Sequence, residues 1–103
     1  MITSDNGGVS DFSNKGLRGK KSNVWEGGHR VPGIFRWPGT IPAGSRSEVP
    51  ICGVDFLPTV CGLAGAAVPK GLKADGENVG DIFLKGTRPR TKPLFWEWRF
   101  GVA

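Results

Sequence analysis

Glycine recurs through this sequence at short intervals, and near the N-terminus it occurs in pairs at Gly7–Gly8 and Gly27–Gly28. The chain of 103 residues holds 17 glycines and 8 prolines, which leave few stretches long enough for an uninterrupted helix or strand. A chain of this length forms at most one domain and buries a modest fraction of its surface. We therefore expect a thin core and a backbone that is mostly turn and loop.

The segment from residue 4 to residue 33 concentrates side chains that suit charged ligands. Asp5 and Asn6 place a carboxylate and an amide side by side, and hard oxygen donors of this kind suit Ca²⁺ or Mg²⁺. Nearby cations suit an anionic group drawn to such an ion. The cations in this segment include Lys20, Lys21 and Arg30, and it also holds the only histidine of the chain, His29. The composition of the segment indicates part of a metal site that handles an anion.

Several motifs occur in a fixed order along the chain. S-D-N-G-G begins at Ser4, L-R-G-x-K precedes W-E-G-G-x-R-x-P-G, and R-W-P-G and D-F-L-P-T follow. This ordered set resembles the later part of a sulfatase catalytic domain of the arylsulfatase type, over residues 2 to about 85. A lone S-D-N-G-G would be a weak signal, because its residues favour turns, whereas the ordered set is specific.

The resemblance implies a calcium site at Asp5 and Asn6. In sulfatases the matching residues complete a Ca²⁺ site whose other carboxylates lie earlier in the domain. Two oxygen ligands are too few for Ca²⁺, which takes six to eight. The alternative for the same residues is a simple turn.

The resemblance also implies a substrate contact at Lys21, which lies four residues before Trp25. Sulfatases place a lysine at that spacing to bind the substrate sulfate, and a preorganised ammonium there would neutralise charge on the transferring group. Because the local sequence departs from the usual G-K-G-T-T pattern, Lys20 remains a second candidate. A solvated loop lysine is the alternative for both.

Supporting roles are expected for Glu26, His29 and Arg30. Glu26 and Arg30 match the family and are predicted to pair and hold the turn at 25–28. His29 is the only histidine, and its position varies in the family, so we interpret it as a rim or structural residue and not as a general acid. No residue of this chain is predicted to be catalytic.

The sulfatase nucleophile is a formylglycine made from the cysteine of C-x-P-S-R or C-x-A-S-R, and neither Cys52 nor Cys61 lies in such a motif. We expect both cysteines to be buried, unpaired thiols. Without the nucleophile, the other metal carboxylates and the catalytic histidines, the chain by itself is expected to be inactive.

The predicted fold class is α/β, as part of an alkaline-phosphatase-like sulfatase fold with short strands, one clear helix and much loop. Residues 1–103 are predicted to be part of one catalytic domain. Within it, residues 4–33 carry the metal and sulfate loops, residues 34–65 a strand and a helix, and residues 66–98 a loop, a short helix and a terminal strand.

The local patterns give the expected elements. Residues 1–3 and 34–37 are predicted strands, the first of them buried, and residues 94–98 alternate as a final strand would. Asp55 is the predicted N-cap of a helix that Gly65 ends, and its apolar stripe is expected to pack on the sheet. The stripe consists of Leu57, Val60, Cys61 and Ala64. A short second helix is expected at 79–84.

The formal charge of +5 would attract sulfates, phosphates or nucleic acid without specifying which. The expected partner is a sulfate ester or another anion, and exposed strand edges favour self-association. A noncatalytic anion-binding or partner-binding module is the alternative. A basic nucleic-acid binder is the other alternative, but the sequence contains no recognisable reading motif for nucleic acid. No stretch is apolar for long enough to span a membrane, so no membrane partner is expected.

Overall fold

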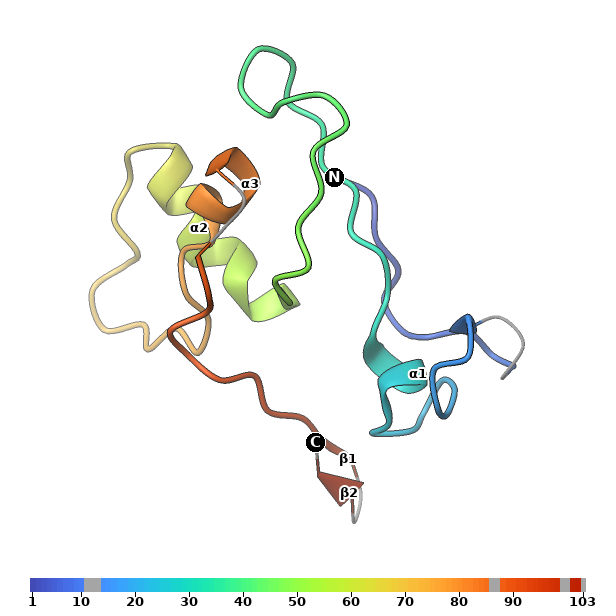
Figure 1. The fold of residues 1–103 in the computed structure, drawn as a ribbon. Coiled ribbons are helices and arrows are strands. Elements are labelled where there is room, and N and C mark those ends of the chain that lie inside the picture. The colour runs from blue at the N-terminus through green and yellow to red at the C-terminus, as the bar shows by residue number, and fades with distance from the viewer. Residues whose placement is uncertain (11–13, 86–87, 99–100, 103) are drawn as a thin grey trace. The chain divides into compact units, whose positions relative to one another are not determined.

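The computed structural model describes residues 1–10, 14–85, 88–98 and 101–102 (Figure 1). It divides into two compact units. Unit 1 combines residues 1–36 with the described residues from 95 onward, and unit 2 comprises residues 37–94. Residues 11–13 of the predicted site loops and residues 86–87 of the predicted 66–98 region lie outside the described residues.

Regular structure is confined to short elements, as the glycine and proline content predicts. In chain order they are α1 (Glu26–His29), the 3₁₀ turn η2 (Gly53–Asp55), α2 (Phe56–Leu63), α3 (Gly80–Lys85), β1 (Glu97–Trp98) and β2 (Gly101–Val102). The described chain contains no helix with the length and apolar character needed to cross a membrane.

The predicted strands at 1–3 and 34–37 meet in unit 1, but only as a single antiparallel bridge between Ile2 and Ile34. Their amides and carbonyls exchange two hydrogen bonds of 2.8 Å. The prediction of a buried strand is wrong, because Ile2 is 69% exposed and Ile34 is 58% exposed. Within the described ranges no third strand pairs with either segment, so the ladder does not extend and the side chains stay uncovered.

The final strand is realised only at its end. β1 pairs with β2 as an antiparallel hairpin in the register Glu97↔Val102 and Trp98↔Gly101. Residues 94–96, which were predicted to belong to the same strand, have no assigned secondary structure.

The predicted helix of unit 2 is present as α2, which continues directly from η2. Its C-terminus is a Schellman motif: the Gly65 amide donates to the Gly62 carbonyl at 3.3 Å, and the Ala66 amide donates to the Cys61 carbonyl at 2.8 Å. Gly65 has a φ of +68°, which a residue with a side chain rarely adopts. The prediction that Gly65 ends the helix is confirmed.

The predicted buried stripe of α2 is wrong. Leu57 is 45% exposed, Val60 is 61% exposed, and Ala64 is exposed as well, whereas the buried side chain of α2 is Thr59. Its hydroxyl oxygen accepts a hydrogen bond of 2.9 Å from the Val79 amide. The helix therefore turns a polar side chain toward its packing partner, because that hydroxyl satisfies the backbone amide just before α3.

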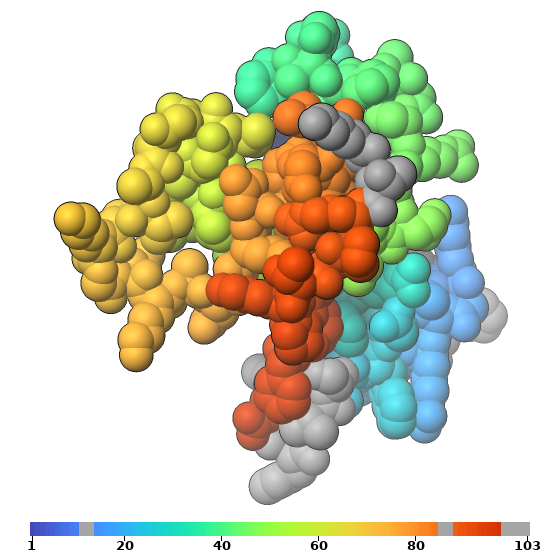
Figure 2. Space-filling view, turned by 60° about the vertical axis from the view of Figure 1, so that its left-hand side comes forward, coloured from blue at the N-terminus to red at the C-terminus, as the bar shows by residue number. Residues whose placement is uncertain are grey.

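The packing partner of α2 is α3 (Figure 2), and not a sheet. α3 lies within one residue of the predicted 79–84 helix at each end. Val79, directly before α3, and Ile82, within it, are the buried apolar residues that form the core of the described chain. Cys52 and Cys61 are unpaired, as predicted, but they are half-buried and not buried.

Candidate metal and anion site

Backbone hydrogen bonds in unit 1 join the three parts of the predicted site. The Gly7 amide donates to the Gly28 carbonyl at 2.9 Å, which ties the Asp5–Asn6 loop to α1. The Lys21 amide donates to the Gly8 carbonyl at 2.9 Å. This bond ties the same loop to the turn at residues 20–23, called the lysine turn below because it carries Lys20 and Lys21. The structure thus brings together the segments that carry Asp5, Asn6, Lys20 and Lys21.

Asn14 reinforces this arrangement, although the sequence did not single it out. The side chain is buried, and its Oδ1 accepts a hydrogen bond of 2.8 Å from the Gly8 amide while its Nδ2 donates one of 2.7 Å to the Gly19 carbonyl. The Asn14 side-chain amide therefore bridges the Asp5–Asn6 loop and the turn that precedes Lys20. Its only signal in the sequence is a polar residue inside a glycine-rich loop.

Three glycines are required here by close backbone approach. A Cβ on Gly7 would lie 1.8 Å from the Gly27 carbonyl oxygen, and one on Gly27 would lie 2.1 Å from the Gly19 carbonyl oxygen. A Cβ on Gly28 would lie 2.0 Å from the Asn23 carbonyl oxygen. The tight turn predicted at 25–28 is therefore wrong in kind: the segment forms the single helical turn α1, and its glycines serve packing and not unusual backbone angles.

Asp5 is exposed and Asn6 is half-buried, so their side chains remain accessible from solvent. The Ser4 hydroxyl donates a hydrogen bond of 2.9 Å to the Asn6 carbonyl, which fixes the backbone of the loop. The donor set is chemically suited to a hard cation. No group of three or more His, Cys, Asp or Glu side chains that could hold a metal gathers in the part of the chain that the structure describes. Asp5 and Asn6 alone offer two such donors, fewer than a Ca²⁺ ion takes.

Lys20 and Lys21 are both exposed. The Lys20 amide donates to Asn23 Oδ1 at 3.0 Å, and the Asn23 amide donates to the Lys20 carbonyl at 2.9 Å, so Asn23 closes the lysine turn. Neither ammonium is paired with a carboxylate in the described ranges. Both side chains are available to an anion.

A groove of about 520 Å³ lies beside this turn. Its lining residues are Gly16, Leu17, Arg18, Gly19, Lys20, Asn23 and Trp25. The guanidinium of Arg18 lies 3.5 Å from the centroid of the Trp25 ring, in a cation–π contact. Arg18 is the arginine of the L-R-G-x-K motif and was not predicted as a site residue; its position two residues before Lys20 is its signal in the sequence.

The expected ion pair between Glu26 and Arg30 is present, with Arg30 Nη1 at 2.8 Å from Glu26 Oε2. Both side chains are more than half exposed, so the pair contributes little stability. His29, the third residue predicted to have a supporting role, stacks on Trp96 with ring centroids 4.4 Å apart and an angle of 22° between the ring planes. Its buried Nδ1 has no hydrogen-bond partner among the residues described here. The interpretation of His29 as a rim or structural residue stays a prediction.

A second polar cluster lies in unit 2, where no site residue was predicted. Arg90 makes two hydrogen bonds to Asp55, of 2.6 Å from Nη1 to Oδ2 and 3.0 Å from Nη2 to Oδ1. Asp55 also accepts hydrogen bonds from the amides of Cys52 and Glu77. Burial alone would raise the pKa of the Asp55 carboxyl, but these donors and the Arg90 charge outweigh burial and hold that pKa below its ordinary value.

Glu77 and Asp81 extend the cluster. Burial raises the pKa of Glu77, but hydrogen bonds from the hydroxyl and amide of Thr91 overcome this effect and lower it. A hydrogen bond from Arg88 lowers the pKa of Asp81. Asp55 does occupy the predicted N-cap position of α2, but its carboxylate binds Arg90 and makes no capping hydrogen bond to α2.

Comparison with known proteins agrees with this arrangement of motifs. The Sulfatase family model matches residues 1–66. Steryl-sulfatase of Homo sapiens is 44% identical over 104 residues, which cover 91% of this chain and 18% of that protein. Steryl-sulfatase of Rattus norvegicus is 46% identical over 79 residues, covering 77% of this chain and 14% of that protein. Arylsulfatase of Hemicentrotus pulcherrimus is 35% identical over 101 residues, covering 93% of this chain and 18% of that protein.

The chain thus spans less than a fifth of the length of these relatives. The family model covers more than half of the chain, and the matched residues include the loops that carry Asp5, Asn6 and Lys21. On these grounds the chain belongs to the sulfatase family, which implies a fold of the alkaline-phosphatase-like type.

Proposed function

We propose that this chain is a piece of a sulfatase catalytic domain and that it contributes part of the metal site and the sulfate contact for hydrolysis of a sulfuric ester. One observation carries the proposal: the Gly7–Gly28 and Lys21–Gly8 backbone hydrogen bonds join the Asp5–Asn6 loop to the lysine turn. Oxygen donors and unpaired ammonium groups thereby lie on connected loops, as a site for a metal-bound anion requires. Within the whole domain these loops would lie at the edge of an α/β sheet, the fold proposed for the family segment.

Each residue has a role in this proposal. Asp5 and Asn6 would provide two oxygen ligands to calcium, with the remaining ligands supplied by other segments. When bound, calcium would supply positive charge that draws and polarises the sulfate group. Lys21 would hold a sulfate oxygen through its ammonium, with Lys20 as the second candidate. Glu26 and Arg30 would have a supporting role through their exposed ion pair along α1.

The printed 103 residues contain no formylglycine motif, so we propose that they do not hydrolyse sulfate esters alone. The test is an assay of the purified chain with an aryl sulfate and Ca²⁺, beside an Asp5→Ala variant. We expect no turnover from either protein. Turnover that disappears in Asp5→Ala would show that these residues form a complete active site and would contradict this part of the proposal.

The partial site itself is tested by calorimetric titration of Ca²⁺ and of sulfate at low and high salt. We expect weak Ca²⁺ binding that Asp5→Ala abolishes, because a hydrated cation gains little from two ligands. Sulfate binding should weaken in Lys21→Gln and at high salt, since an exposed ammonium is screened. Sulfate binding that is unchanged in both Lys21→Gln and Lys20→Gln would refute the proposed sulfate contact.

A noncatalytic, self-associating module is the second candidate, and the exposed apolar side chains of α2 favour it. Leu57 and Val60 leave a large apolar area in water, and covering such an area drives association. We propose that the isolated chain forms dimers or larger assemblies, to which the exposed segments at Ile2 and Ile34 also contribute. Light scattering of the chain and of a Val60→Lys variant tests this: the variant should be more monomeric. A monodisperse wild-type monomer would contradict it.

A further inference from the structure

The groove beside the lysine turn has a composition that the proposed sulfate and metal contacts do not use. Arg18, Lys20 and Trp25 line it, whereas Lys21, Asp5 and Asn6 do not. None of its seven lining residues carries a carboxylate, so no lining residue neutralises the charges of Arg18 and Lys20. The groove has a volume of about 520 Å³ and is open to solvent.

Arg18 is held in a geometry that leaves its hydrogen-bonding edge available. The guanidinium lies 3.5 Å from the Trp25 ring centroid. The indole therefore orients the guanidinium and covers one face of the guanidinium plane. No carboxylate pairs with it within the described ranges, in contrast to Arg88 and Arg90 of unit 2. The in-plane N–H groups of such a guanidinium match two oxygens of an oxyanion.

The backbone fixes the two ends of the groove relative to each other. The Gly27 amide donates to the Arg18 carbonyl at 2.8 Å, and Asn14 holds the Gly19 carbonyl at 2.7 Å. Gly19 has a φ of +85°, and a Cβ there would lie 2.8 Å from Trp25 Cβ, so this turn is restricted to glycine. Arg18, Lys20 and Trp25 are therefore presented by a constrained turn, which lowers the ordering cost of binding.

From these observations we propose that Arg18, Lys20 and Trp25 form a second oxyanion subsite, which binds a sulfate, sulfonate or phosphate group carried on a flat ring. The guanidinium and the Lys20 ammonium contact the oxyanion, and the exposed part of the Trp25 indole contacts the ring. The role for substrate recognition rests on the proposed function: the subsite takes a non-reacting anionic group of a substrate that carries more than one. It also separates the two lysines, with Lys20 in the groove and Lys21 left for the reacting sulfate.

The experiment is an NMR titration of the full chain with naphthalene-2-sulfonate, with inorganic sulfate and 2-naphthol as partial probes. We expect the Trp25 indole N–H and the Gly16, Gly19 and Asn23 amides to shift together. The sulfonate should bind about tenfold more tightly than either partial probe, because it satisfies both the cations and the ring. Equal affinity for 2-naphthol, or shifts centred away from these residues, would overturn the subsite.

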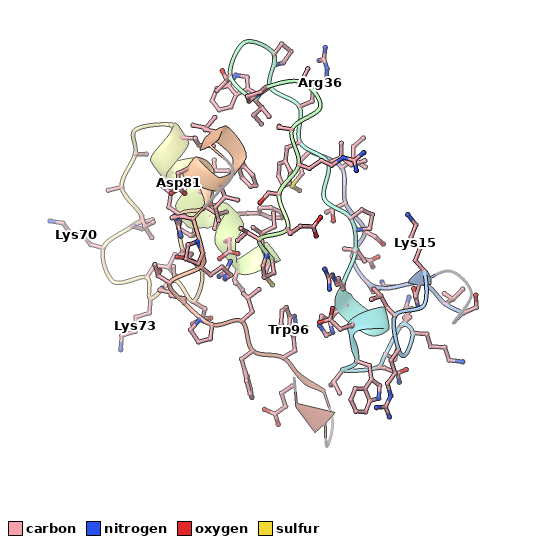
Figure 3. The ribbon with its side chains drawn as sticks, viewed as in Figure 1. Lys15, Arg36, Lys70, Lys73, Asp81 and Trp96 are labelled. Atoms are coloured by element: carbon pink, nitrogen blue, oxygen red, sulfur yellow. The ribbon has the colours of Figure 1, made fainter. Side chains whose placement is uncertain are left out.

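Variants identify the residues. Arg18→Gln and Lys20→Gln should each weaken sulfonate binding about tenfold, while Arg18→Lys should retain part of it because charge remains without the fork. Lys20→Gln is not expected to disturb folding, since the hydrogen bonds of Lys20 to the described residues are made by its backbone. The matched control is Lys70→Gln in unit 2, where the Lys70 side chain points away from the chain (Figure 3) and the charge change is the same. An equal loss in Lys70→Gln would reduce the effect to net charge and overturn the proposal.

Lys21→Gln distinguishes failure of this inference from failure of the proposed function. Sulfonate binding that survives in Lys21→Gln and is lost in Arg18→Gln supports the subsite, whatever the outcome of the calcium and sulfate titrations. Binding that is lost in Lys21→Gln and survives in Arg18→Gln places the oxyanion at Lys21 and overturns the subsite, while it supports the proposed sulfate contact.

Discussion

The Arg90 guanidinium donates two hydrogen bonds to the Asp55 carboxylate, although the two residues lie 35 positions apart in the chain. Asp55 is fully buried and the Arg90 side chain is 9% exposed. A charge pair at this depth costs desolvation and is tolerated because both oxygens of the carboxylate are satisfied. The pair ties the start of α2 to the segment that follows α3, and it is the structural basis of the first two predictions.

Replacing Arg90 with Gln leaves the Asp55 carboxylate buried without its ion-pair partner. We expect this change to lower the free energy of unfolding by about 3–5 kcal/mol, the usual effect of removing one partner of a buried pair. Urea unfolding followed by circular dichroism measures it. Arg46→Gln is the matched control, because Arg46 is exposed in the same unit, and its midpoint should stay near wild type. Equal midpoints for the two variants would contradict a stabilising pair.

Acid should destabilise the chain through the same cluster. The pKa values of Asp55, Glu77 and Asp81 are lower in the folded state than their ordinary values of 3.8, 4.5 and 3.8, so the ionised forms favour folding. Their contribution is complete above about pH 4.5 and is lost as the pH falls through the folded pKa values. We expect a constant urea midpoint from pH 7 to pH 5 and a steep fall below pH 4. Asp81→Asn removes one of the three groups and should make that fall shallower, whereas a midpoint that rises on acidification would refute the linkage.

Gly7→Ala tests the close packing beneath the candidate site. The added Cβ would lie 1.8 Å from the Gly27 carbonyl oxygen, so the Asp5–Asn6 loop must move away from α1. We expect a loss of about 1–3 kcal/mol and faster hydrogen exchange at the Lys21 amide, which donates to the neighbouring Gly8 carbonyl. Gly53→Ala is the control, since a Cβ there meets nothing within 4 Å. Retained protection of the Lys21 amide in Gly7→Ala would show that the loop and α1 are not packed as described.

The Asn6–Gly7 bond should resist deamidation while the chain is folded. The reaction requires the Gly7 backbone nitrogen to attack the Asn6 side-chain carbonyl carbon, which releases ammonia and closes a succinimide that water then opens to Asp or isoAsp. In the structure Gly7 is buried and its amide donates to the Gly28 carbonyl at 2.9 Å. The Gly7 nitrogen must break this hydrogen bond before it can attack the Asn6 side chain. Peptide mapping after incubation should find isoAsp at position 6 accumulating in urea and not in buffer. Equal accumulation in both solvents would show that this hydrogen bond opens readily.

The local features of this protein could be predicted from the sequence. The end of α2 at Gly65 and the approximate position of α3 follow from glycine and apolar spacing within a few residues. The family could be recognised from the order of short motifs, and the pairing of Glu26 with Arg30 from the resemblance to that family. Each of these features depends on residues that are neighbours in the chain.

Only the tertiary structure decided which side chains meet across longer separations. The Asp55 carboxylate was expected to cap α2, and it binds Arg90 instead. The expected buried stripe of α2 is exposed, and the helix packs through Thr59 onto α3. Apolar spacing predicts which residues form a face, but it does not say what covers that face. The choice depends on which distant segment brings a matching donor, charge or surface, and a chain rich in loops allows many such approaches that its local sequence does not distinguish.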